Sequence, residues 1–412
     1  MDLTISAEKQ ALVERAKELA ATYREEAFAN DDGAAFPASA FERLRKAGFL
    51  RLSLPLDLGG QGFWSLDPPL ADRFVPYYQV LAALASGDAS TGQLVQIQTH
   101  ATGIVARHGN AEQRERFLGE VVRRGALISS CGSEADPETP GVASPGNSEL
   151  RPVPGGFRVT ASKHFASLAP AADFHLVYLR APGIQTPGQS TVLVVVPKGD
   201  AGVSVVDNWD TLGMRATISW QLRLDDVFVP WENVLGQPGD WVLNDPRTFT
   251  LAYAANYLGT AQGAYEFVLG LVRERPAMLN DDVTAYMLGD MDAVLQAASM
   301  SMNYAAWLWE QGRFADAEIA GVRAVHTAKQ AALAVTNKSI EVVGARGTFR
   351  RLPLERALRD VRTFTLHSRD SRNTRRIAEA AAKGASHSKQ AYGPLVERLS
   401  WEQINIKQPV TA

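Results

Sequence analysis

The pattern of apolar and polar positions divides the chain into three parts. In residues 1–126, apolar side chains recur at helical spacing, which predicts helices interrupted by loops. The first helix begins after Ser6, a residue type favoured at the N-cap. A second helix closes at Gly48, and a long helix rich in small residues is predicted from about Val75 to Ala106. The first part is therefore expected to be a helical domain.

The pattern changes near residue 127. Short runs of β-branched and aromatic residues alternate with Gly, Pro and Asp, as is typical of a β-sandwich or β-barrel. Residues 136–148 and 181–190 are rich in turn-forming residues and are predicted to be loops. The predicted strands are 157–165, 173–180, 190–197, 202–206 and 220–230.

A helical period returns after residue 237. Three segments, 249–275, 281–312 and 315–344, are much longer than an average globular helix, and their abundant Ala and Gly permit close packing in a bundle. The fold class predicted is therefore α+β. It comprises an N-terminal helical domain (1–126), a central β-barrel or β-sandwich domain (127–236) and a C-terminal bundle of long helices (237–412).

Composition narrows the functional classes. Hydrophobic residues make up 46% of the 412 and charged residues 21%, and the formal net charge is −3, so nothing indicates a nucleic-acid or membrane-surface partner. The single cysteine, Cys131, excludes an intrachain disulfide and a multi-cysteine metal site, and no metal is expected. The N-terminus does not resemble a signal peptide and no segment is apolar enough to span a bilayer, so we expect a cytoplasmic protein.

Four motifs occur in order along the chain. The loop 55–64 reads PLDLGGQGFW, the segment 155–179 contains a Lys-x-Phe-x-Ser sequence, 212–236 ends in VPWENVLG, and 339–360 reads SIEVVGARGTFRRLPLERALRD. Each resembles a signature of the acyl-CoA dehydrogenase family. Because the four together cover nearly the whole chain, the match is far more specific than a single glycine motif. The chain is identified as a member of that family.

The resemblance implies a flavin oxidoreductase, with the flavin between the β-domain and the C-terminal helices. Ser167 takes the place of the small polar residue expected near flavin N5, and Phe165 stands where the family usually has Trp beside the isoalloxazine. Ser133 and the backbone near Cys131 are expected at the pyrimidine edge. A flat apolar side chain with nearby hydrogen-bond donors is also what a flavin requires on physical grounds.

The family forms tetramers or dimers, so a homotetramer or homodimer is expected. By resemblance, the segment from Glu341 to Gly347 comes from the neighbouring subunit and touches the phosphates or adenosine of the cofactor. Gly344 and Gly347 lie at a helix end, where a backbone can approach a phosphate closely. The alternative is that these glycines only terminate the helix.

The carboxylate base of the dehydrogenases is missing. The reaction of an acyl-CoA dehydrogenase needs a positioned carboxylate to remove a proton next to the thioester carbonyl. By resemblance, that Glu would stand at Ser368 or, in a minority of members, at Tyr253. Asp370 lies two residues beyond Ser368, so on a helix it would point away. The ordinary dehydrogenase mechanism is therefore disfavoured.

A second branch of the family fits better. The sequence Arg-Thr-x-Thr-Leu-His at 362–367 and the Lys-x-Phe-x-Ser form at 163–167 resemble its flavin-dependent monooxygenases. These enzymes receive reduced flavin from a separate flavin reductase and oxygenate a bound small-molecule substrate. The resemblance makes His367 a catalytic residue, with His100 and Ser167 as further candidates. His100 could equally be a hydrogen-bonded packing residue.

The dehydrogenase-specific FAD segment is poorly matched at 273–291, which lacks Phe-Gly, so FMN fits as well as FAD. Three hypotheses remain. The first is a monooxygenase of a two-component system, acting on an aromatic, heteroatom or aminosugar-like compound. The second is a dehydrogenase with a relocated base, and the third is a scaffold that binds flavin or acyl groups without turnover. The sequence does not identify the substrate, because pocket loops vary freely within one fold.

Overall fold

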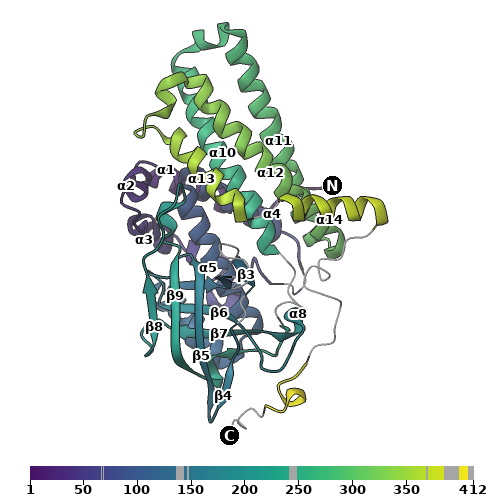
Figure 1. Ribbon diagram of the computed structural model, residues 1–412. Coiled ribbons are helices and arrows are strands. Elements are labelled where there is room, and N and C mark those ends of the chain that lie inside the picture. The colour runs from purple at the N-terminus through teal and green to yellow at the C-terminus, as the bar shows by residue number, and fades with distance from the viewer. Residues whose placement is uncertain are drawn as a thin grey trace.

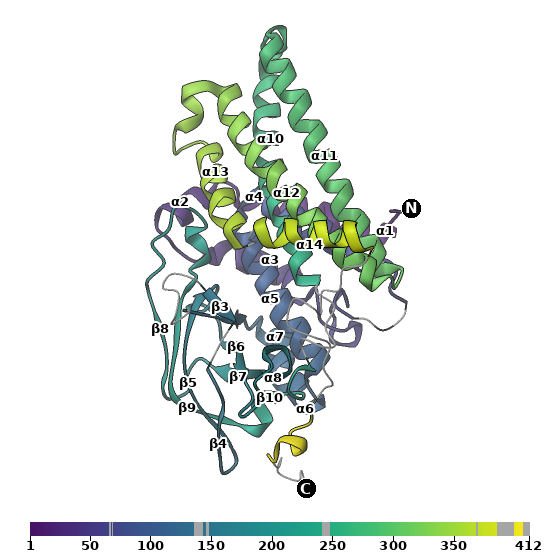
Figure 2. The ribbon, with the colours of Figure 1, turned by 45° about the vertical axis from the view of Figure 1, so that its right-hand side comes forward.

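The computed structural model describes residues 1–412 except 66, 68, 136–142, 146–147, 241–247, 368–369, 385–398 and 407–412. Strands gather at one end of the molecule and the long helices at the other, with helix α5 (Ala89–His108) between them (Figures 1 and 2). The predicted α+β class with a helical start, a β middle and a helical end is confirmed.

Helices form the N-terminal part, as predicted. The Ser6 hydroxyl accepts a hydrogen bond from the backbone N–H of Lys9 and so caps the first helix. The elements are α1 (Ala7–Tyr23), α2 (Glu26–Asp32), α3 (Ala38–Lys46), α4 (Phe74–Gly87), α5, α6 (Ala111–Gln113) and α7 (Gly119–Arg124). The shorter turns are η1 (Phe49–Arg51), η2 (Leu56–Leu58) and η3 (Arg114–Leu118).

The single long helix predicted from Val75 to Ala106 is wrong, because the structure divides it at Asp88. Asp88 has an extended backbone, and its carboxylate accepts hydrogen bonds from the backbone N–H and the hydroxyl of Thr91. An Asp at this position competes as an N-cap with helix continuation. The apolar period runs on through the break, which is why the pattern alone did not reveal it.

The middle part contains two sheets. One has the strand order β1-β6-β7-β10, and the other has the order β3-β2-β5-β9-β8 with β4 paired to β5. All pairs are antiparallel except β1 with β6. The strands are β1 (Ile128–Cys131), β2 (Ser133–Ala135), β3 (Ala143–Pro145), β4 (Arg151–Val153), β5 (Gly156–Ala166), β6 (Phe174–Arg180), β7 (Thr191–Pro197), β8 (Val203–Val206), β9 (Trp220–Pro230) and β10 (Val234–Leu235).

The five predicted strands are confirmed as β5 to β9. The two predicted loops also contain short elements, since β3 falls within 136–148 and α8 (Pro187–Ser190) within 181–190. Strand β3 is only three residues long, and a segment of that length gives no readable alternation of apolar and polar residues.

Long helices form the C-terminal part, as predicted. They are α10 (Thr248–Glu274), α11 (Asp282–Glu310) and α12 (Phe314–Val343), followed by α13 (Pro353–Phe364) and α14 (Asp370–Lys383). The shorter turns are η4 (Arg215–Thr217) and η5 (Trp231–Asn233) in the β-domain, and η6 (Pro276–Asn280), η7 (Gly344–Thr348), η8 (Thr365–His367) and η10 (Glu402–Ile404) after it.

The N-terminal and C-terminal helices share one hydrophobic core. Side chains of α4, α5, α10, α11, α12 and α13 all belong to it, and α10 lies against α4. The end of the chain returns to the β-domain, where Trp401 packs on Phe157 and Trp231. Among the described residues, no helix is long and apolar enough to cross a membrane.

Helix α5 connects the two ends of the molecule. Along its length it contacts α10 and α13 of the bundle, η4 of the β-domain and strand β1. Nearly all of its side chains are buried. Of the predicted site residues, His100 lies on this helix and Cys131 on strand β1, which the helix contacts.

Candidate active site

Phe165 presents an aromatic ring to solvent at the end of strand β5. The pairing of β5 with β9 shifts register between Lys163 and Ala166, and within this bulge Phe165 adopts a φ of +55°. Its side chain is 49% exposed, and its ring meets Trp209 edge to face with centroids 6.0 Å apart. A β-bulge with left-handed backbone geometry commonly re-aims a side chain at a functional site. The geometry suits a ring that contacts a flat cofactor.

Ser167 lies two residues further on, in a chain of hydroxyl groups. Its Oγ is 2.7 Å from Ser219 Oγ, which is 2.7 Å from Thr217 Oγ1. Thr217 in turn donates to the backbone oxygen of Met214 over 2.7 Å. Ser167 is buried, so its orientation is set by this chain of hydroxyl groups. The predicted hydroxyl near the flavin is therefore held by residues of the 212–236 motif.

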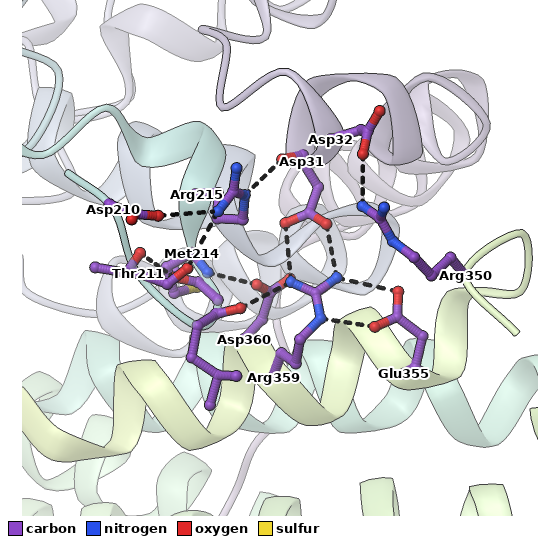
Figure 3. A network of polar contacts seen from close by, with 12 residues as sticks. Asp31, Asp32, Asp210, Thr211, Met214, Arg215, Arg350, Glu355, Arg359 and Asp360 are labelled. Atoms are coloured by element: carbon purple, nitrogen blue, oxygen red, sulfur yellow. Dashed lines mark hydrogen bonds and ion pairs between the residues drawn. The ribbon is translucent and has the colours of Figure 1, made fainter. Parts of the chain in front are cut away.

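The loop around Met214 is anchored by a charged network at the junction of all three parts of the chain (Figure 3). Arg359 of α13 donates to both carboxylate oxygens of Asp31 on α2, at 2.6 and 3.2 Å, and to the backbone oxygen of Leu212 at 2.9 Å. Asp360 accepts from Met214 N at 2.5 Å. Asp31 is buried and Arg359 is half-buried, and their bidentate geometry makes such a contact stronger than a surface pair.

Asp360 is itself almost fully buried. Burial, with a further contribution from Asp88, raises the pKa of its carboxyl group to about 7. Both carboxylates line a cavity of about 20 Å³, large enough for about one water molecule, together with Arg356. The charge of Asp360 therefore changes near neutral pH. Asp360 also supports the loop from Met214 to Ser219, and Ser219 is hydrogen-bonded to Ser167.

His367 lies at the end of η8 in a group of aromatic rings. Its ring is 5.7 Å from Tyr253 of α10 and 5.2 Å from Phe364. Its side chain keeps exposed surface, yet protein crowds it closely enough that desolvation lowers its pKa. The imidazole is therefore neutral at pH 7.

One of the two positions at which the family places its carboxylate, Tyr253, lies in the described part of the structure. Ser368 lies outside the described residues, but its neighbour His367 contacts Tyr253, the second position. The carboxylate of Asp370 is 2.9 Å from the ammonium group of Lys329. An ion pair of this kind holds Asp370 toward α12. His367 and Tyr253 thus place an imidazole beside a phenol.

His100 is buried on α5 and faces the β-domain. Its Nε2 is 2.7 Å from the Tyr178 hydroxyl, and Trp64 meets its ring edge to face at 5.1 Å. The sequence left open whether His100 is catalytic or a packing residue. The structure shows a histidine with a fixed orientation, which either role requires.

The predicted residues of β1 and β2 divide into two groups. The Cys131 side chain is buried, its Sγ is 3.3 Å from Ser129 Oγ, and burial raises the pKa of its thiol to about 11. Only the backbone of Cys131 can therefore serve a ligand, as the resemblance implies. Ser133 is half-buried at the start of β2.

The segment from Glu341 to Gly347 ends α12. Gly344 has a φ of +73° and caps the helix through its backbone N–H, which requires glycine. Gly347 is buried against Ile340, whereas Gly344 and Glu341 are exposed. The Glu341 carboxylate accepts a hydrogen bond from Asn337. Helix termination is thus evident within one subunit, and contact with the cofactor of a neighbour remains a prediction.

Several residues were missed from sequence. Tyr178, Trp64 and Trp209 hold predicted site residues, and Ser219 and Thr217 complete the hydroxyl chain. Ser219 and Thr217 lie inside a recognised motif, so their position was a usable signal. Tyr178 is an ordinary aromatic residue in a strand, and its role depends on packing against α5, which no local pattern encodes.

Comparisons with known proteins agree with this geometry. Models of the N-terminal, middle and C-terminal domains of acyl-CoA dehydrogenase match residues 6–124, 140–227 and 251–371. A dibenzothiophene monooxygenase of Mycolicibacterium goodii is 30% identical over 86% of this chain and 89% of its own length. A putative acyl-CoA dehydrogenase of Bacillus subtilis, YdbM, is 28% identical over 85% of this chain and 91% of its own.

Among solved structures, the complex of TdsC from Paenibacillus sp. A11-2 with FMN and indole superposes with a TM-score of 0.81. It is 24% identical and covers 93% of this chain and 100% of its own, which shows the same fold. The match to three family domains and to a relative at 30% identity shows the family. The chain belongs to the acyl-CoA dehydrogenase superfamily of flavin-dependent oxidoreductases.

Proposed function

We propose that this protein is a flavin-dependent monooxygenase of a two-component system, in which a separate reductase supplies reduced FMN or FAD. The observation that carries the proposal is the contact between His367 and Tyr253, which places an imidazole beside one family base position, while neither base position, Tyr253 or Ser368, is a glutamate in the sequence. The relatives named dibenzothiophene monooxygenase support it. The substrate is a small molecule, with an aromatic, heteroatom or aminosugar-like compound as the class to test.

The residues present fit a flavin. Phe165 offers an exposed aromatic face next to Trp209, and the Ser167 hydroxyl lies two residues away. The TdsC neighbour contains FMN, which supports the same cofactor class here. The weak match at 273–291 to the FAD segment of the dehydrogenases favours a transiently held flavin over a permanently bound one.

When bound, reduced flavin supplies the reaction with O₂ from which oxygen reaches the substrate. The contributions of this chain follow from its geometry. His367 is neutral at pH 7, so its imidazole can donate one hydrogen bond and accept another. Phe165 and the aromatic wall of Tyr253 and Phe364 exclude water from the reacting groups. Ser167 adds a donor of fixed orientation.

A dehydrogenase is the second candidate, because YdbM is nearly as similar to this chain as the monooxygenases are. The two candidates are separated by anaerobic stopped-flow spectroscopy of the flavin-loaded protein with a short, a medium and a long acyl-CoA. The monooxygenase proposal expects no bleaching of the flavin by any of the three. Bleaching at more than a trace rate by one of them would overturn it.

A positive measurement complements that test. The protein is supplied with FMN, NADH and a flavin reductase, and O₂ uptake is followed with and without candidate substrates. A monooxygenase shows substrate-dependent oxygenated product that requires the reductase. A protein that binds no flavin in any redox state would instead support the scaffold hypothesis.

We also propose a homotetramer or homodimer. Helix α11 exposes an apolar stripe along its outer face, in which Tyr286 is 68% exposed. The stripe comprises Val283, Tyr286, Ala293, Ala297, Met300 and Tyr304, spaced three to seven residues apart. An apolar face of this length on a soluble subunit is typical of an interface between copies. In such an assembly the Glu341–Gly347 segment would reach the flavin of another subunit.

A further inference from the structure

His100 is held on two sides. The planes of its ring and of the Tyr178 ring are parallel within 1°, with centroids 6.5 Å apart, and Nε2 lies at hydrogen-bond distance, 2.7 Å, from the Tyr178 oxygen. Trp64 covers the ring from another direction. Gly103 makes this possible, because a Cβ there would come within 2.9 Å of the indole, and Arg107 donates to the Trp64 carbonyl. The imidazole is therefore fixed before any ligand binds.

Tyr178 is in turn tied to the strands that carry the expected flavin contacts. Ser130 Oγ of β1 donates to the Tyr178 hydroxyl at 3.3 Å. The buried Lys163 of β5 donates to the Tyr178 carbonyl at 2.5 Å and pairs with Glu134 of β2, also at 2.5 Å. The Tyr178 ring also packs beside Gly132, where an added Cβ would be in ordinary van der Waals contact with it at 3.5 Å. Tyr178 thus joins three strands to α5.

We propose that Tyr178 is the positioning residue for His100: its hydroxyl fixes the orientation and the tautomer of the imidazole. The direction of the hydrogen bonds supports this. Ser130 donates to the phenol oxygen, and on this proposal the phenol's own proton is assigned to the hydrogen bond with His100 Nε2. An imidazole that accepts at Nε2 carries its proton on Nδ1. The Nδ1–H group then lies on the side of the ring away from Tyr178.

This inference rests on the proposed function, because it gives His100 a use as a proton donor beside the reacting groups. A donor of fixed direction is worth more than one that must reorient during the reaction. These hydrogen bonds connect strands β1 and β5 to His100 through Tyr178, so a shift of either strand would be transmitted to His100. The nearest precedent on physical grounds is a second residue that orients a catalytic histidine through its other nitrogen.

The first arm of the test needs no cofactor. Protein labelled with ¹⁵N-histidine, without flavin, is studied by solid-state NMR, and the His100 signals are assigned with His100→Ala. The wild type is expected to show a protonated Nδ1 and an accepting Nε2. In Tyr178→Phe, which removes one oxygen and keeps the ring, a second tautomer or orientation is expected. Tyr23→Phe is the control, because it also removes one phenol oxygen, whose hydroxyl donates to the Leu84 carbonyl on other elements, between α1 and α4.

The second arm uses photoreduced FMN and O₂ as probes, with no organic substrate. Flavin reoxidation in the presence of protein is followed by absorbance, together with hydrogen peroxide release. Tyr178→Phe is expected to accelerate reoxidation by about tenfold. His100→Ala should do the same, and Tyr178→Phe in the His100→Ala background should add nothing, because the two residues act as one unit.

Unchanged ring-nitrogen signals in Tyr178→Phe would overturn the proposal. An equal effect of Tyr178→Phe with and without His100, or no effect of His100→Ala, would overturn it as well. Failure of the proposed function is distinguishable, because acyl-CoA would then bleach the flavin while the NMR arm still reports the link between Tyr178 and His100.

Discussion

At the scale of single residues, the charge state of His367 determines which reactions this residue and its aromatic neighbours can support. Desolvation lowers its pKa, so the ring is neutral across the physiological range and gains a proton only in acid. A neutral imidazole is a hydrogen-bond donor and acceptor at once, whereas a carboxylate would be a base only. The replacement of the family glutamate therefore changes the type of reaction that the fold can catalyse.

The corresponding prediction concerns His367→Ala. We expect reduced-flavin binding within about twofold of wild type, and a loss of coupled product formation of about 10²–10³, with reducing equivalents diverted to hydrogen peroxide. Product and peroxide are measured in the same reaction. Leu366→Ala, an exposed neighbour, and Ser368→Ala should change the ratio much less. Equal uncoupling in all three variants would contradict a specific role for the imidazole.

Asp360 provides a pH-dependent prediction. Its pKa is raised to about 7 in the folded protein, mainly by burial and also by Asp88 and Asp31, while Arg356 opposes the shift. The folded protein therefore keeps a proton that the unfolded chain has released between about pH 4 and pH 7. Stability due to this group falls as the pH rises through that window and is constant above it. The loss at pH 8 is on the order of 4 kcal/mol.

Asp360→Asn should abolish that fall, because the amide oxygen can still accept from Met214 N. We expect the variant to gain stability relative to wild type as the pH rises from about 5 to about 8. Urea unfolding at both pH values measures the difference. A free energy difference between the two proteins that does not change with pH would show that Asp360 is ionised throughout.

At the scale of elements, helix α10 owes its position to two glycines. A Cβ at Gly259 would lie 2.1 Å from the carbonyl oxygen of Ala82, and one at Gly263 would lie 2.2 Å from that of Ser86. The two backbones of α4 and α10 therefore touch. Because α10 carries Tyr253 and α4 leads into α5, this close contact fixes the distance between two walls of the site.

Gly259→Ala is expected to destabilise the protein by about 2–4 kcal/mol, since the clash is with backbone that cannot move aside. Gly270→Ala, on the same helix, meets nothing within 4 Å and should stabilise by about 0.5–1 kcal/mol. Denaturant unfolding of the pair checks the prediction. Similar effects of the two substitutions would show that helix propensity outweighs packing at both positions.

The elements also show how far a sequence can be interpreted. The three long helices and five main strands follow from hydrophobic period, because each is long enough to repeat its pattern several times. The break at Asp88 and the strand β3 were missed, because a cap and a three-residue strand are decided by single hydrogen bonds. Motif resemblance selected His367, Phe165 and Ser167, whereas their supporting contacts arise only from tertiary packing.

At the scale of the whole molecule, the N-terminal and C-terminal helices share one hydrophobic core, and further contacts join them to the β-domain. The network around Arg359 joins α2, α13 and the loop before Ser219, and α5 runs from the bundle to strand β1 (Figures 1 and 3). Helix α11 belongs to the bundle and not to the strand-containing end (Figure 1), and the side chains of its apolar stripe are exposed within one subunit.

The last prediction tests that contact. The wild type should scatter light as a dimer or tetramer at micromolar concentration, with an interface above roughly 2,000 Å². Replacing Tyr286 and Met300 together by Glu places two like charges in the stripe of each subunit, so desolvation and repulsion should dissociate the assembly. Leu56→Glu alters a residue that is equally exposed but lies on η2, and should leave the mass unchanged. Circular dichroism should show that the helices persist, since Glu is a good helix former.

If the Glu341–Gly347 segment of one subunit completes the flavin site of another, the dissociated variant should also bind reduced FMN at least about tenfold more weakly. This is the loss expected when one or two hydrogen bonds to phosphate are removed. A monomeric wild type would exclude the assembly, and a dissociated variant with unchanged flavin affinity would show that each subunit binds its cofactor alone.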